Sequence, residues 1–177
     1  MRRLVASFSQ ETLVRLPGPP AHHTAASRKL VSYGASAIPY LLEGVGSPDP
    51  NVRRHSAFVL AQIGDTSAYH ELQRAALREF AALEGATGAD PRSRRMPLDM
   101  IVIALTRIDP EATMDWLCTQ NTVDIRELYG VLSAILQDVP VCGDDEAALC
   151  RKRLNSWCAA DRAVRLRMLK PHPWLSD

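Results

Sequence analysis

Apolar residues recur every three or four positions from Ala25 onward, in blocks of about ten to fifteen residues. This spacing places them on one face of an α-helix. Gly, Pro, Asp and Asn separate the blocks, and these residues commonly end or start helices. No segment has a convincing strand pattern, so an all-α protein is expected. The blocks predict helices at 24–33, 35–45, 51–63, 66–84, 97–108, 110–119, 124–137, 144–158 and 160–169.

The residues between the blocks support these boundaries. The Asp-Pro pairs at 49–50 and 109–110 place a capping side chain directly before a proline. Proline is well tolerated at the first position of a helix, because its missing N–H has no intrahelical partner there. Glycines stand where helix ends favour a left-handed residue, at Gly34, Gly64 and Gly143.

The N-terminal residues are separated from the rest by prolines. Residues 1–16 could form a short amphipathic helix, which the segment 16–20 (LPGPP) then breaks. We therefore divide the chain into an N-terminal helix with a Pro-rich linker at 1–20 and a helical repeat domain at 21–177. With 177 residues, 46% of them hydrophobic, the chain can bury the core of one domain.

Three segments in the first half combine into a recognisable unit: 34–42 (GASAIPYLL), 49–53 (DPNVR) and 57–65 (AFVLAQIGD). Together they resemble a complete HEAT repeat of the short type associated with bilin lyases. The resemblance implies a turn at Gly64-Asp65 and a set of core-facing residues in the second helix. Helical spacing independently places the same residues on one face: Val52, Ser56, Val59, Leu60 and Ile63.

Two weaker copies follow. Residues 101–117 parallel 59–72 at a shift of about 45 residues, as expected for a repeated helix pair. Residues 124–138 form a third copy, in which Arg126 stands where Arg53 stands in the first.

The resemblance covers residues 24–140 and implies a right-handed α-solenoid of antiparallel helix pairs, an armadillo-type superhelix. It departs from the family at 85–97, where we expect a longer, basic loop. Because each repeat buries its apolar face only against its neighbours, both ends need caps. The N-terminal helix and residues 144–170 are the candidates.

In the resembled family, the second helix of each repeat lines the concave face, so its non-core positions are candidates for partner binding. Along the concave face these positions form a row. The row contains several apolar residues and could receive a partner helix or an apolar ligand. Alternatively, the protein's own terminal segment or the 85–97 loop covers it, which would make it ordinary core. The candidate partner-binding residues are Arg54, His55, Phe58, Gln62, Met100, Ile103, Arg107, Leu128, Val131 and Ile135.

The formal net charge of +1 gives no global attraction to nucleic acid or membranes, but the charge is unevenly distributed. Acidic residues dominate from 109 to 146 and basic residues from 151 to 170. This basic patch could meet an acidic protein surface or phosphates, or be a solvated end face. It consists of Arg151, Lys152, Arg153, Arg162, Arg165, Arg167 and Lys170.

The four cysteines, Cys118, Cys142, Cys150 and Cys158, lack CxxC spacing, so we interpret them as buried free thiols. No apolar stretch is long enough to span a membrane or to form a signal peptide. We expect a cytoplasmic protein without a metal or another cofactor.

Three kinds of enzyme chemistry are possible on such a fold, and none is favoured. A di-iron site needs several converging His-Glu pairs, and only His70-Glu71 is present. A DNA glycosylase needs a basic, aromatic concave surface, whereas this row is apolar. Bilin lyases share the short repeat, but a fold does not establish a function.

We therefore predict a non-enzymatic interaction module, such as an adaptor, inhibitor or regulatory subunit, that binds a helix or acidic segment of a partner protein. The apolar row would anchor the partner, and Arg54 and Arg107 would orient it. The alternatives are a ligand-holding or bilin-lyase-like role for the same row, and nucleic-acid binding through the basic patch.

Overall fold

The computed structural model describes residues 1–10, 24–84, 91–120, 123–137 and 147–169. Within these ranges every regular element is a helix, and the sole β-type pairing is an isolated bridge between Leu136 and Leu169. The predicted all-α class is therefore confirmed.

The N-terminal part of the array consists of α1 (Arg2–Ala6), η1 (Ser7–Gln10), α2 (Ala25–Ser32), η2 (Gly34–Ala37), α3 (Ile38–Val45) and α4 (Pro50–Ile63). The middle consists of η3 (Thr66–Ala68), α5 (Tyr69–Glu84), α6 (Pro91–Ile108) and α7 (Pro110–Cys118). The C-terminal part consists of α8 (Ile125–Ile135), α9 (Ala147–Cys158) and α10 (Arg162–Arg167).

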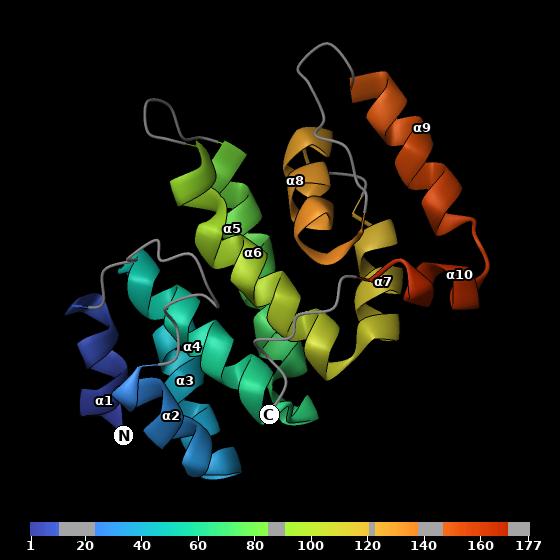
Figure 1. Ribbon diagram of the computed structural model, residues 1–177. Coiled ribbons are helices and arrows are strands. Elements are labelled where there is room, and N and C mark those ends of the chain that lie inside the picture. Colours follow the sequence, from blue (N-terminus) through green and yellow to red (C-terminus); the bar gives the residue numbers. More distant parts are fainter. Residues whose placement is uncertain (11–23, 85–90, 121–122, 138–146, 170–177) are drawn as a thin grey trace.

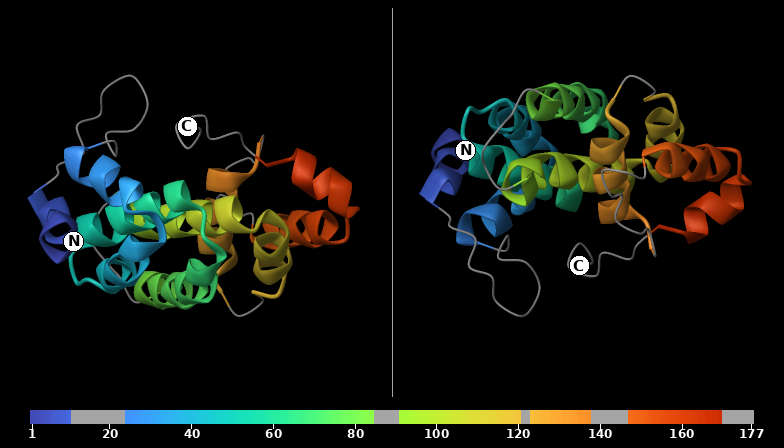
Figure 2. Two further views of the ribbon diagram at one scale, coloured as in Figure 1. Left: turned by 90° about the horizontal axis from the view of Figure 1, so that it is seen from below. Right: turned by 90° about the horizontal axis from the view of Figure 1, so that it is seen from above.

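The helices form an elongated array that follows the order of the chain. Helices α1 and α2 lie at one end, α5 and α6 in the middle, and α9 and α10 at the other end (Figure 1). The two views of Figure 2 show the same progression along the long axis. Contacts connect α3 with α4, α5 with α6, α4 with α6, and α6 with α8.

The predicted helix boundaries at the two Asp-Pro pairs are confirmed. Asp49 accepts hydrogen bonds from the N–H groups of Asn51 (2.8 Å) and Val52 (3.4 Å) at the start of α4. Asp109 accepts one from Ala112 N–H (3.0 Å) at the start of α7. Helix α4 ends at Gly64, whose φ of 68° is the left-handed conformation that favours glycine. Gly143 lies outside the described residues.

Helix α4 is the central element of the N-terminal half, because α2, α3, α6 and η1 all pack against it. Its residues 54–61 are all buried, so no side of this stretch faces solvent. The predicted core positions Val52, Ser56, Val59 and Leu60 are buried, and Ile63 is half-buried.

The predicted loop at 85–97 is wrong in its second half, because α6 begins at Pro91. Pro91 takes the favoured first position of the helix. Pro97 stands inside the helix, where it removes one backbone hydrogen bond at a cost of about 3 kcal/mol. The burial of Leu98, Ile101 and Leu105 just beyond it offsets that cost.

Candidate functional site

The predicted concave row lies in the protein core. Gln62 is half-buried and Arg107 is exposed, but the other eight positions are buried: Arg54, His55, Phe58, Met100, Ile103, Leu128, Val131 and Ile135. The exposed apolar row is therefore a wrong prediction for these eight residues. These residues are ordinary core, as the alternative interpretation expected, but the mutual packing of α4, α6, α8 and α9 covers most of them, and the terminal segment contributes only in part.

The N-terminal segment provides part of this cover. Phe8 of η1 stacks on His55, with ring centroids 5.1 Å apart and planes 22° apart. The His55 Nδ1–H donates to the carbonyl oxygen of Asn51 (2.9 Å). Burial lowers the pKa of His55 to about 4, because the charged ring would lose its solvation. His55 is therefore a neutral core residue.

Part of the basic patch is paired with the protein's own acidic segment. Arg162 of α10 pairs with Glu111 of α7, and Arg165 Nη1 lies 2.9 Å from Asp115 Oδ1. Glu111 raises the pKa of Arg162 by accepting its hydrogen bond. The uneven charge of the sequence therefore partly serves to join α10 to α7. Lys170 lies outside the described residues.

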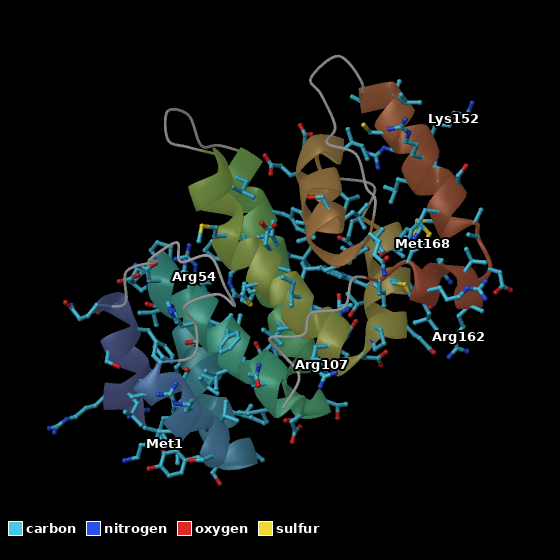
Figure 3. All side chains as sticks on the ribbon, in the orientation of Figure 1. Met1, Arg54, Arg107, Lys152, Arg162 and Met168 are labelled. Carbon is cyan, nitrogen blue, oxygen red and sulfur yellow. A yellow bond between two sulfur atoms is a disulfide. The ribbon has the colours of Figure 1, made fainter. Side chains whose placement is uncertain are left out.

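The cations of α9 border a groove that the sequence did not predict as a unit, which we call the α9 groove. Its volume is about 440 Å³, and it is a shallow hollow that is widely open to solvent. Figure 3 shows Lys152 projecting outward from α9 and Met168 beside α10. The groove is lined by Leu149, Lys152, Arg153, Ser156, Trp157, Ala160 and Met168.

Helix α9 supplies the groove because it has two different faces. Its inner face carries the buried residues Cys150, Leu154 and Trp157. A second stripe follows the spacing 149, 153, 156 and 160, which also traces one side of a helix. Leu149 in this stripe is 43% exposed, although leucine is usually buried. The α9 groove thus has an apolar floor and a cationic rim.

Gln137, which follows α8, positions the other wall of the groove. The Gln137 backbone N–H donates to the carbonyl oxygen of Met168 (2.8 Å). The Gln137 side-chain Nε2 donates to the carbonyl oxygen of Leu169 (2.9 Å). These two hydrogen bonds fix the segment after α10 against the end of α8, so Met168 faces α9 across the groove.

The three described cysteines form disulfides instead of the predicted free thiols, and Cys142 lies outside the described residues. Cys118 and Cys158 are joined, with their Cα atoms 5.7 Å apart, and Cys150 is also disulfide-bonded. The described residues therefore include no free cysteine. A separation of 40 residues along the chain does not reveal this pairing. It becomes visible only when the ends of α7 and α9 are placed together.

A second hollow, of about 530 Å³, lies between α1, α3 and the start of α4. Its polar groups already have partners within the protein. Arg2 makes two hydrogen bonds to the Glu43 carboxylate (3.0 and 2.8 Å), and the Asp49 carboxylate caps α4. Within the described ranges, Lys152 and Arg153 in the rim of the α9 groove make no ion pair, so the α9 groove is the stronger candidate.

The described residues include no group of three or more His, Cys, Asp or Glu side chains placed to hold a metal ion. The His70-Glu71 pair makes local contacts instead: His70 lies against Gln73, and Glu71 pairs with Arg74. In the described part of the chain, no helix combines the length and apolarity required to cross a bilayer.

The chain matches no protein-family model, and no significant match was found among curated proteins or solved structures. The chemistry of the α9 groove is therefore the basis for assigning a function.

The sequence did predict Lys152 and Arg153 as part of a basic patch, but it missed the apolar residues between them. Leu149, Trp157 and Met168 supply the floor of the α9 groove. The stripe at 149, 153, 156 and 160 was a signal that could have been found. No sequence signal marked Met168 as a groove residue, because its position in the groove depends on the contact with Gln137.

Proposed function

We propose that the protein is a non-enzymatic interaction module that binds an acidic, amphipathic segment of a partner protein in the α9 groove. The observation that carries this proposal is the exposed Leu149 beside the exposed cations Lys152 and Arg153. These three residues border a floor formed by Trp157 and Met168. Such a combination of apolar anchor and charged rim is typical of protein-binding sites.

The charge of the rim favours an acidic partner. Lys152 and Arg153 are both exposed, and no acidic residue is among the described residues that line the groove. A carboxylate placed there gains a favourable interaction with both cations. An apolar side chain of the partner would cover Leu149 and displace water from the floor.

We further propose that the array is a HEAT-like solenoid. Three observations support this proposal: the repeat pattern in 34–65, the progression of the helices along the long axis, and the chain of contacts from α4 through α6 to α8. In such an array the proposed binding site lies on the α9–α10 unit instead of on the concave face.

The disulfides indicate in which kind of cellular compartment the protein occurs. Disulfides form and persist in oxidising environments and are rare in the cytosol. The bond between Cys118 and Cys158, with the bonded state of Cys150, therefore favours an oxidising compartment over the cytoplasm that the sequence suggested.

The proposal is tested with two fluorescein-labelled helical peptides that carry leucines at positions i, i+4 and i+7. One peptide has glutamates on its other positions and its counterpart has lysines. We expect fluorescence anisotropy at physiological salt to show binding of the acidic peptide only. Leu149→Asp should weaken this binding at least about tenfold, because it removes the apolar anchor and repels the peptide.

Leu77 provides the matched control. It lies on α5, outside the groove, and is 44% exposed, nearly the same as Leu149. Leu77→Asp should leave the affinity unchanged. Equal binding of both peptides, or equal effects of the two aspartates, would overturn the proposal. Binding of a single-stranded oligonucleotide that falls steeply with salt would instead indicate the nucleic-acid alternative.

A further inference from the structure

The disulfide between Cys118 and Cys158 joins α7 to α9, the helix that supplies most of the groove lining, although neither cysteine lines the groove itself. Cys118 is the last residue of α7 and Cys158 the last residue of α9. Trp157, which supplies part of the groove floor, is the neighbour of Cys158 in the chain. The bond thus fixes the position of the helix end that completes the groove.

Apart from the disulfide, the contacts that hold α10 against α7 are weak. Helix α10 has no buried residue. Its two ion pairs with α7 each include a side chain at least 64% exposed, and exposed ion pairs contribute little to stability. The inner face of α9 packs through Cys150, Leu154 and Trp157, with Trp157 beside the disulfide. The covalent link therefore holds the end of α9 against α7, while the two Gln137 hydrogen bonds hold the segment after α10.

The two sulfur positions differ from Cys150 in their accessibility. Cys118 and Cys158 are both partly exposed, whereas Cys150 is completely buried. A disulfide exchanges only when a thiolate can reach one of its sulfur atoms. A reductant can therefore approach the partly exposed Cys118–Cys158 pair more easily than the buried Cys150.

We infer that the Cys118–Cys158 disulfide controls the α9 groove: the oxidised protein presents the binding site, and reduction of this bond dismantles it. The regulated site is the one assigned under the proposed function, so the inference rests on that function. A protein dithiol would be the reductant. It gives two electrons and two protons, leaving Cys118 and Cys158 as thiols and the dithiol as a disulfide; the reverse exchange restores the groove.

The first experiment separates the state of the groove from the binding of a partner. Backbone hydrogen exchange is followed in oxidised protein and in protein treated with dithiothreitol. The reduced sample should exchange faster in α9 and α10, whereas α4 and α6 should stay protected. The acidic peptide described above should bind the reduced protein at least about tenfold more weakly, because fewer molecules have a formed groove.

The variant Cys118→Ser/Cys158→Ser tests whether the faster hydrogen exchange and the weaker peptide binding come from loss of the Cys118–Cys158 disulfide. We expect this variant to show the fast exchange of α9 and α10 and the weak peptide binding without any reductant. Dithiothreitol should then change neither property further. A variant that binds like the oxidised wild type and loses binding only after reduction would assign the control to the disulfide of Cys150 and overturn the inference. Helicity and the protection of α4 check that the variant remains folded.

The outcomes distinguish this inference from the proposed function. If oxidised protein binds the acidic peptide and reduction changes neither the binding nor the exchange of α9, the control by the disulfide is wrong and the binding site stands. If reduction exposes α9 but the oxidised protein binds neither peptide, the disulfide does order the helix, and the function assigned to the groove is wrong.

Discussion

His55 makes the stability of the core dependent on pH. Its pKa is lowered to about 4 by burial, with Arg54 adding a smaller effect in the same direction and Asp49 opposing it. The unfolded chain therefore binds a proton between about pH 6.5 and pH 4 that the folded protein does not. Stability should fall as the pH falls through this window, by at most about 3 kcal/mol.

Urea unfolding at pH 7.0, 5.5 and 4.5 measures this effect. The matched variant is His55→Asn, whose amide can still donate to the Asn51 carbonyl but does not titrate. The variant should lose part of the slope of stability against pH in this window. Equal slopes in the two proteins would show that His55 is not the titrating group.

Gly44 is a second residue whose role follows from its surroundings. A Cβ atom at Gly44 would lie 2.2 Å from Ser56 Oγ and 2.7 Å from Val5 Cγ1, closer than non-bonded atoms allow. Gly44→Ala should therefore force α1 and α4 away from α3 and destabilise the protein by about 1–3 kcal/mol. Gly46→Ala is the control, because its nearest neighbour would lie at 3.4 Å; a change under about 1 kcal/mol is expected from chemical denaturation.

At the scale of elements, a shielded ion pair joins α4 to α5. Arg53 Nε lies 2.5 Å from Glu79 Oε1, and the two side chains are 20% and 10% exposed. Arg53 Nη1 also donates to the carbonyl oxygens of Ser47 and Pro48 (both 2.9 Å), so it fixes the turn before α4 as well. Removal of the carboxylate leaves a poorly solvated cation.

We expect Glu79→Ala to reduce the free energy of unfolding by about 2–3 kcal/mol, as measured by thermal or urea denaturation. Glu71→Ala on the same helix is the control. It removes an ion pair with Arg74 in which the side chains are 43% and 64% exposed, and the expected change is below about 0.5 kcal/mol. Comparable losses in the two variants would contradict this difference in burial.

Individual helices are the level at which the sequence was most informative. Periodicity located α2 to α10, and the Asp-Pro pairs fixed the starts of α4 and α7, because capping is a local interaction. The start of α6 was missed for the opposite reason. Pro97 is locally unfavourable in a helix, and only the tertiary burial of Leu98 and its neighbours compensates for it.

At the scale of the whole molecule, the sequence could not predict which helix faces are covered. The phase of the repeat placed Phe58, Met100 and Leu128 on a binding face, whereas the packing of α4, α6 and α8 buries all three. Likewise, the pairing of Cys118 with Cys158 and the contact of Gln137 with Met168 join residues far apart in the chain. Such contacts depend on the final arrangement and leave no local pattern.

The burial of α4 on all sides also affects how variation in this protein should be interpreted. An ordinary surface helix accepts substitutions every third or fourth position, so tolerated changes alternate with forbidden ones. Residues 54–61 offer no such positions, since every residue of this stretch is buried and α2, α3, α6 and η1 pack against α4. A survey of tolerated substitutions would find an unbroken intolerant block that includes an arginine and a histidine. That block would look like a catalytic motif, although packing alone produces it.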